Sequence, residues 1–284
     1  MEPVAAPTEA APNGRRLVRT ATDLVPLGKE GPLICRLGLG TGSDGGNVQR
    51  ALGTEGFNRL VRYAYERGIT FFDTADQYKT HSFVRDAVKG LPREDLWIQT
   101  KMAWDSPAPP ERPLEVLERF LRELGMDYID SLLIHCATAA DWDEQLRPMM
   151  DAFSEAKKRG LIRYHGVSCH GLPALRRAVH CDWIEVHLAR VNPQGEHIDG
   201  VDGTWGEPGN VPEAMREIEA MHAKGRGVIG MKMIGGGHFV EPTERERALQ
   251  YAMNCGFVDS VVVGFASTFE VDEAIQRMNR ALGV

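Results

Sequence analysis

The chain of 284 residues is 43% hydrophobic and 26% charged, which is the composition of an ordinary soluble globular protein. Its net charge of −7 provides no basic surface for nucleic acid or an anionic membrane, so we expect neither as a partner. No apolar run is long enough for a transmembrane helix, and five widely spaced cysteines favour reduced thiols in a cytoplasmic protein.

The first part of the chain is predicted to contain a tail and a hairpin. Residues 1–15 are rich in Ala, Pro, Glu and Thr, so we expect a flexible tail before a single domain that spans residues 16–284. The domain is predicted to open with a β-hairpin, whose strands are residues 16–18 and 33–35 and whose turn is residues 27–31.

From residue 37 onward, strand-like and helix-like segments alternate to the end of the chain. Short apolar runs predict the strands, and apolar residues at spacings of three and four predict the helices. The predicted strands are residues 37–42, which end in glycines, and residues 69–73, 96–101, 128–134, 162–168, 184–188, 227–233 and 260–263. The predicted helices are residues 53–67, 82–89, 113–124, 146–158, 172–179, 211–223, 243–253 and 269–282.

Strict alternation of eight strands with about eight helices predicts an α/β fold with a parallel sheet and right-handed crossovers. Eight repeats predict that the sheet closes into a (β/α)8 TIM barrel with an N-terminal β-hairpin. An open doubly wound sheet is the main alternative, but residues 38–43 lack the third glycine of a GxGxxG motif.

Four residues with proton-handling side chains stand at the ends of three consecutive predicted strands. Asp73, Lys101 and His135 end or directly follow these strands, and Tyr78 lies in the loop after Asp73. Barrel enzymes work at the C-terminal ends of their strands, so the four are expected to meet. Each residue alone has a structural explanation, as a capping acid, a solvated amine or a core imidazole. Together they predict one site.

The four side chains form a coherent acid–base set. An ammonium near a phenol is expected to lower the phenol pKa from its ordinary value of about 10. Lys101 would supply this charge, Asp73 would hold Lys101, and His135 would orient a carbonyl oxygen or assist the proton transfer. Such a site can protonate an oxygen as it becomes an alkoxide, as carbonyl reduction by hydride requires.

These residues resemble the signature of the aldo-keto reductase family. The match consists of Phe-Asp-Thr-Ala at 72–75 with Tyr78, Thr-Lys at 100–101, Leu-Ile-His at 133–135 and Gly-Val-Ser at 166–168. The resemblance covers roughly residues 16–284 and implies a barrel that binds a nicotinamide cofactor in an extended form. It also implies reversible reduction of an aldehyde or ketone, with Tyr78 as the general acid and the other three residues supporting it.

The resemblance places the cofactor over the ends of the last strands, where loops of such barrels favour phosphates. Glycines at 235–237 would let backbone N–H groups approach an anion, although a flexible loop explains them equally well. Ser267 and Glu270 have the spacing of a helix capping box. The predicted cofactor contacts are Gly42, Ser168, Cys169, Leu188, Lys232, Ile234, Gly235, Gly236, Gly264, Ser267, Glu270 and Glu273.

Three of these positions depart from the family pattern. Glu270 stands where similar NADP-using members have an arginine for the 2′-phosphate, and a carboxylate instead suits a free 2′-hydroxyl. NADP and NAD therefore both remain open as the cofactor. Cys169 replaces the usual Asn, and Leu188, with His187 beside it, replaces the usual Gln. We therefore expect altered anchoring of the nicotinamide.

The long loop at residues 190–210 is a candidate for substrate binding. Its side chains include His197, Asp199, Asp202 and Trp205, which suit a polar substrate such as a sugar or hydroxy-carbonyl compound, although a packed surface loop is the other explanation. The alternative function is a dinucleotide-binding regulatory barrel with little turnover. No metal site is expected, and the sequence predicts no oligomeric state.

Overall fold

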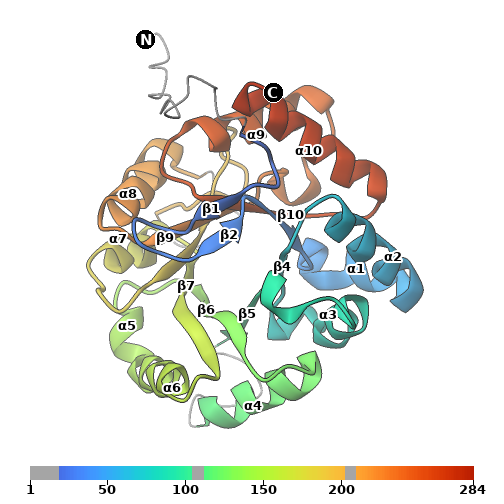
Figure 1. Cartoon of the computed structure of the whole chain (residues 1–284). Coiled ribbons are helices and arrows are strands. Elements are labelled where there is room, and N and C mark those ends of the chain that lie inside the picture. Colours follow the sequence, from blue (N-terminus) through green and yellow to red (C-terminus); the bar gives the residue numbers. More distant parts are fainter. Residues whose placement is uncertain (1–18, 104–111, 202–208) are drawn as a thin grey trace, which may run out of the picture.

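Eight parallel strands close into a barrel within the part of the chain that the computed structural model describes, residues 19–103, 112–201 and 209–284. The strands run around the barrel in the order β10-β3-β4-β5-β6-β7-β8-β9 (Figure 1). They are β3 (Leu37–Gly40), β4 (Phe71–Asp73), β5 (Trp97–Ala103), β6 (Ile129–Ala137), β7 (Ile162–Cys169), β8 (Val186–Arg190), β9 (Gly227–Met231) and β10 (Ser260–Gly264). The predicted (β/α)8 barrel is confirmed.

Helices cover the outside of the barrel (Figure 1). The longer helices are α2 (Gly53–Glu66), α3 (His81–Val88), α4 (Pro113–Leu124), α6 (Arg147–Lys158), α7 (Leu172–Val179), α8 (Val211–Ala223), α9 (Pro242–Asn254) and α10 (Thr268–Leu282). The shorter ones are α1 (Asn47–Ala51), α5 (Trp142–Gln145) and the 3-10 turns η1 (Ser43–Gly46), η2 (Asp76–Tyr78), η3 (Arg93–Asp95) and η4 (Gly235–Gly237). Within the described residues, none of the helices combines the length and the apolar character needed to cross a bilayer.

The helix α4 illustrates how the sequence pattern produces this layer. Its residues Val116, Leu117, Phe120 and Leu124 recur at helical spacing and are all buried. Gly125 ends the helix in the left-handed conformation, at φ 65°, which glycine adopts without a steric penalty. The apolar stripe of α4 thus packs in the core, and the glycine cap ends the helix.

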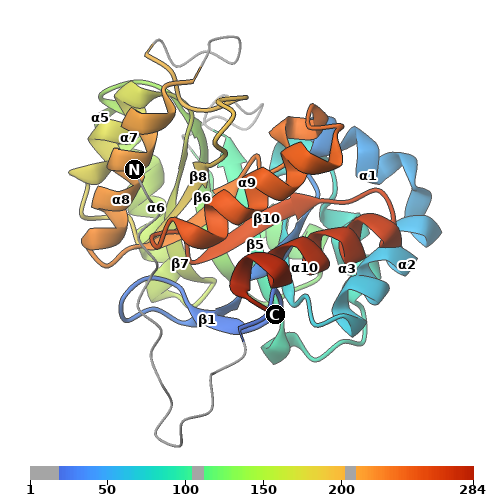
Figure 2. The same ribbon diagram turned by 90° about the horizontal axis from the view of Figure 1, so that it is seen from above.

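A two-stranded sheet closes one end of the barrel. The strand β1 (Leu24–Pro26) pairs antiparallel with β2 (Leu33–Cys35), and β1 lies at the end of the barrel in Figure 2. The hairpin was predicted, and the strand that pairs with β2 is Leu24–Pro26. The first strand predicted at residues 16–18 and the predicted tail lie outside the described residues. Leu24–Pro26 is short, half-exposed and ends in a proline, so it carries a weak strand signal.

Apolar side chains fill the hairpin end of the barrel and leave the opposite end to polar groups. This inner core joins the hairpin to the strands and consists of Leu27, Ile34, Cys35, Phe71, Trp97, Leu133, Val186, Leu188, Ile229 and Val262. Beyond it, toward the C-terminal strand ends, the interior holds the buried side chains of Asp73, Lys101, His135 and Ser168. Burying a polar side chain costs free energy unless it has a hydrogen-bonding or ionic partner, so these side chains are expected to contact one another or the backbone.

Candidate active site

A buried ion pair joins β4 to β5. The Lys101 Nζ donates to both carboxylate oxygens of Asp73, at 2.7 Å each, and to the Thr74 carbonyl at 2.9 Å. Gln99, which is opposite Asp73 in the strand register, donates to Asp73 Oδ1 at 2.8 Å. Lys101 follows Gln99 by two residues and therefore shares its inward face. Burial lowers the pKa of Lys101, and the Asp73 charge opposes this shift.

The loop after β4 carries Tyr78 on η2 and is held from both sides. Arg119 of α4 binds both oxygens of Asp76, at 3.0 and 2.8 Å. The Thr80 hydroxyl lies 2.8 Å from the hydroxyls of Thr41 and Thr74, which ties the loop to the ends of β3 and β4. These contacts fix the backbone from which the phenol projects.

The phenol of Tyr78 lies between three neighbours. Its oxygen is 3.4 Å from His135 Nε2, and the two rings meet edge to face with their centroids 5.5 Å apart. The Lys101 Nζ lies 4.9 Å from the centre of the Tyr78 ring. A Cβ on Gly42 would lie 2.6 Å from two ring carbons and 2.9 Å from the phenol oxygen, so the Gly42 backbone supports the ring. The structure thus brings the four predicted residues, Asp73, Tyr78, Lys101 and His135, together.

Burial fixes the protonation states of this group. It raises the pKa of Tyr78 well above 10, and the Asp73 charge raises it further. This direction is opposite to the one expected from the sequence, because the Lys101 charge is directed at Asp73 and desolvation dominates at the phenol. Burial, assisted by the Lys101 charge, lowers the pKa of His135 to about 3. At neutral pH both the phenol and the neutral imidazole can donate a hydrogen bond to an oxygen.

A second imidazole, which the sequence analysis did not assign, lies beside His135. The ring centroids of His135 and His170 are 6.2 Å apart, and His170 Nε2 is 3.2 Å from the Ser168 hydroxyl. His170 Nε2 is also 3.8 Å from the thiol of Cys136, whose backbone has a left-handed φ of 58°. Burial lowers the pKa of His170 well below its usual value, so this ring too is neutral.

The neighbouring residue Cys169 points the other way. Its thiol bonds to the Ala174 carbonyl at 3.6 Å and packs in the core between the barrel and the helices. Successive residues of a strand alternate between faces, so Ser168 and His170 share the inner face that Cys169 leaves. The alternation was therefore the signal that could have identified His170.

A pocket of about 590 Å³ extends from Asp73 and Tyr78 to the start of α10. Seven of the predicted cofactor contacts line it, namely Gly42, Lys232, Ile234, Gly236, Gly264, Glu270 and Glu273. The other predicted contacts, Ser168, Cys169, Leu188, Gly235 and Ser267, do not, and Leu188 lies in the inner core below. Arg245 and Arg277 line the pocket and were missed, because helical arginines give no distinguishing pattern in the sequence.

The far end of the pocket is charged. Arg245 binds both oxygens of Glu273, at 2.9 Å each, and Arg277 binds the same carboxylate at 2.8 Å. The hydrogen bond from Arg245 is the main reason that the pKa of Glu273 falls to about 2. Ser267 caps α10 by accepting from the Glu270 N–H, while the Glu270 carboxylate accepts from the Ala266 N–H at 2.7 Å. Half of the predicted capping box is therefore present.

The loop after β8 is supported by a second buried ion pair. Arg190 and Asp199 are each 1% exposed and lie 3.1 Å apart, and Asp199 also accepts from the Gly171 N–H at 2.6 Å. Asp199 thus supports the loop from within. Asp202 and Trp205, also considered for substrate binding, lie outside the described residues.

The structure contains the barrel, the N-terminal hairpin and the cluster of Tyr, Lys, Asp and His that the family resemblance implies. A sequence model of the Aldo/keto reductase family matches residues 36–247. The chain belongs to this family of NAD(P)-dependent oxidoreductases, as predicted.

Individual relatives agree with this assignment. The chain is similar to the methylglyoxal reductase DkgB of Salmonella typhi, with 34% identity over 147 residues, which is 50% of this chain and 54% of that protein. It is also similar to the probable aldo-keto reductase 1 of Glycine max, with 31% identity over 54% of this chain and 47% of that protein. The chain thus spans about half the length of the curated relatives it matches.

Solved structures share the fold over nearly the whole chain. A putative aldo-keto reductase from Pseudomonas aeruginosa superposes with a TM-score of 0.74 at 21% identity, over 93% of this chain and 97% of that one. An aldo-keto reductase from Bombyx mori, in complex with NADP, superposes with a TM-score of 0.66 at 20% identity, over 91% of this chain and 92% of that one.

Proposed function

We propose that the protein is an NAD(P)H-dependent reductase of a small aldehyde or ketone, with Tyr78 as the general acid. The observation that carries the proposal is the pairing of the Tyr78 hydroxyl with His135 Nε2, 3.4 Å apart. Both groups are neutral, and Tyr78 lines the end of the pocket that is also lined by Asp73. An oxygen bound between them would receive two hydrogen bonds.

The residues of the pocket fit a nicotinamide dinucleotide. Gly42, Gly236 and Gly264 let the backbone border the pocket closely, and at Gly264 an added Cβ would lie 2.0 Å from the Ser43 hydroxyl. The N-terminus of the 15-residue helix α10 and the Lys232 ammonium favour the phosphates. Cys169 and Leu188, which do not line the pocket, are not needed for this fit.

The proton transfer follows from the neighbours of Tyr78. When bound, the nicotinamide supplies the hydride that reduces the carbonyl carbon. Tyr78 then gives its proton to the carbonyl oxygen, and the resulting phenolate is stabilised by the nearby Lys101 charge, which Asp73 holds in place. His135, neutral because its pKa is about 3, donates to the same oxygen and orients the carbonyl.

The groups beside the catalytic set are proposed to replace the missing family anchors of the nicotinamide. Ser168 and His170 present a hydroxyl and an imidazole on the inner face of β7, 3.2 Å apart. Both could hold a carboxamide, whereas Cys169 faces the helices. We therefore assign the altered anchoring, expected from the sequence, to Ser168 and His170.

The substrate panel follows from the relatives and the loop. The similarity to methylglyoxal reductases makes methylglyoxal the first compound, and sugars and hydroxy-carbonyl compounds follow from the sequence prediction. Purified protein is mixed with NADPH or NADH, and the loss of nicotinamide absorbance is followed for each compound. We expect turnover with at least one carbonyl. Dinucleotide binding by calorimetry, without turnover of any compound, would instead support the alternative of a regulatory barrel.

A further inference from the structure

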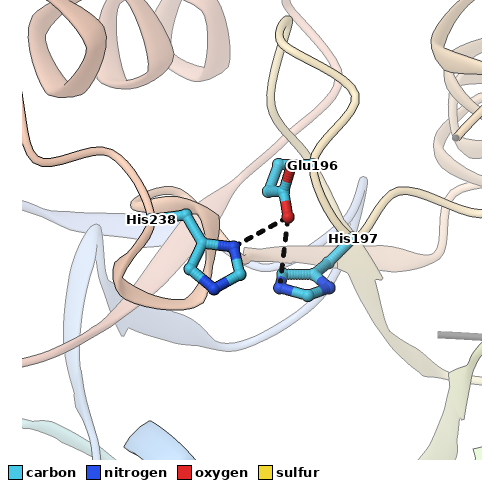
Figure 3. A group of neighbouring side chains, drawn as sticks. All are labelled: Glu196, His197 and His238. Carbon is cyan, nitrogen blue, oxygen red and sulfur yellow. Dashed lines mark hydrogen bonds and ion pairs between the residues drawn. The ribbon is translucent and has the colours of Figure 1, made fainter. Parts of the chain in front are cut away.

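Two loops at the rim of the barrel bring a carboxylate and two imidazoles together. Glu196 and His197 lie in the loop after β8, and His238 directly follows η4 in the loop after β9 (Figure 3). His238 Nδ1 is 2.7 Å and His197 Nε2 is 3.6 Å from Glu196 Oε1. One ligand atom from each of the three residues lies within 4.8 Å of the others. We propose that Glu196, His197 and His238 form a binding site for Zn²⁺ or a similar late first-row divalent cation.

The distances from Glu196 to the two imidazoles suit such an ion, and the two imidazole ligand atoms lie within 4.8 Å of each other. Ligands at about 2.0–2.1 Å from a tetrahedral zinc ion are separated by roughly 3.3 Å. The Glu196–His197 distance of 3.6 Å is close to this value, and the Glu196–His238 distance of 2.7 Å needs a side-chain shift of well under an ångström. Two imidazoles with one carboxylate select zinc, cobalt or nickel over magnesium or calcium, which prefer oxygen ligands.

Buried groups hold the backbone of both arms of the site. The Asn192 amide donates to the Glu196 carbonyl at 2.8 Å and to the Lys232 carbonyl at 3.1 Å, so one fully buried side chain ties the two loops together. The Arg190 guanidinium donates to the His197 carbonyl at 3.0 Å. His197 itself has a left-handed φ of 54°, which is uncommon outside glycine and directs its ring toward Glu196. The ligands are thus positioned by the scaffold before any ion arrives.

Solvent can reach the three ligands. The side chains of His197, Glu196 and His238 are 21%, 42% and 61% exposed, so a hydrated cation can enter and the fourth position can keep a water molecule. The site adjoins the proposed cofactor pocket, because a Cβ on Gly236, a pocket residue, would lie 3.2 Å from the His197 ring. A bound cation would therefore cross-link the loops after β8 and β9 beside that pocket.

The test measures metal binding directly and needs no turnover, so it does not depend on the proposed reductase activity. Full-length protein is stripped with a chelator and titrated with ZnCl2 by calorimetry and with CoCl2 by visible absorption, which reports ligand-field bands of bound Co²⁺. We expect one equivalent of metal, with an affinity roughly tenfold or more lower in His238→Ala and in Glu196→Gln. The control is His180→Ala, since His180 is an exposed histidine outside the cluster.

The controls separate the proposal from its rivals. Melting temperatures of the metal-free variants confirm that each one folds, and Glu196→Gln retains a side chain of the same size. Binding that persists unchanged in His238→Ala and Glu196→Gln, or that His180→Ala weakens equally, would overturn the proposal. So would a protein that takes up no Zn²⁺ and no Co²⁺, because Glu196 and His238 would then only hydrogen-bond the two loops.

Discussion

Gly42 leaves no room for a side chain beside the ring of Tyr78. An alanine Cβ at Gly42 would lie 2.6 Å from two ring carbons, whereas unstrained carbon contacts lie at about 3.5 Å or beyond. The ring must therefore move by roughly 0.9 Å, which displaces the Tyr78 oxygen from its position 3.4 Å from His135 Nε2. A misplacement of about 1 Å in a catalytic group costs on the order of 100-fold in rate, so we expect kcat of Gly42→Ala to fall by about this factor.

The assay compares kcat, the dinucleotide dissociation constant and the melting temperature of Gly42→Ala with those of the parent protein. Gly56→Ala on the helix α2 serves as the control, since its Cβ would touch only Leu52 and Arg59. Because the substitution is expected to act through Tyr78, the double variant Gly42→Ala/Tyr78→Phe should be no slower than Tyr78→Phe alone. Multiplicative losses in the double variant would refute this reasoning.

Three further predictions concern stability and cofactor choice. Lys101→Met leaves the buried Asp73 carboxylate without its counter-ion, so urea unfolding should show a loss of about 3–5 kcal/mol in the free energy of unfolding, partly recovered in Asp73→Asn/Lys101→Met. An unchanged unfolding midpoint in Lys101→Met would contradict the buried pair. Glu270→Arg should raise the ratio of kcat/KM for NADPH to kcat/KM for NADH by roughly tenfold or more, and Glu270→Gln should have an intermediate ratio. A ratio that does not change would mean that the adenosine ribose does not bind beside Glu270. Burial and, to a lesser extent, the charge of Arg226 lower the pKa of His187 to about 3. Between about pH 6.5 and 3 the unfolded chain therefore binds a proton that the folded protein does not, and the free energy of unfolding decreases as the pH decreases. In His187→Leu this loss should be smaller by up to about 1.4 kcal/mol per pH unit, and equal slopes for both proteins would speak against a neutral buried ring.

The barrel could be predicted because its strands are short apolar runs separated by clear helical periods. All eight barrel strands fall within or beside the predicted segments, from Leu37–Gly40 to Ser260–Gly264. The hairpin was only partly predictable. Its first strand, Leu24–Pro26, is held by pairing with Leu33–Cys35 and by the barrel end, not by its own weak pattern.

For the candidate site, the residues could be predicted from the local sequence, but their pKa values could not. Asp73, Lys101 and His135 could be proposed because each stands at or directly after the end of a predicted strand. In the structure β4 ends at Asp73, whereas β5 and β6 continue for two residues beyond Lys101 and His135. The shifts in pKa could not, because burial decides them: Tyr78 was expected to be more acidic and is instead held in its neutral form. Burial depends on the whole barrel, and no local pattern encodes it.

The alternation of a strand shows that neighbouring side chains of β7 point to opposite faces, but it was not used to decide which of them face the interior. Ser168 and His170 face the interior, whereas Cys169 packs under α7. The family pattern suggested cofactor contacts at Cys169 and Leu188, but neither side chain lines the pocket, and we propose Ser168 and His170 in their place. Arginines such as Arg245 reach the pocket from helices through side-chain length and could be found only in three dimensions.

The most direct test of the account is the rate of the hydride-transfer step in Tyr78→Phe, measured by single-turnover reduction of the best carbonyl substrate. The substitution removes one oxygen and leaves the ring that packs on Gly42, so the dinucleotide dissociation constant should stay within a few-fold of the parent value. Loss of a general acid costs about 10²–10⁴-fold, and we expect a decrease in this range. Turnover equal to that of the parent protein, with the same cofactor affinity, would contradict the central role of Tyr78.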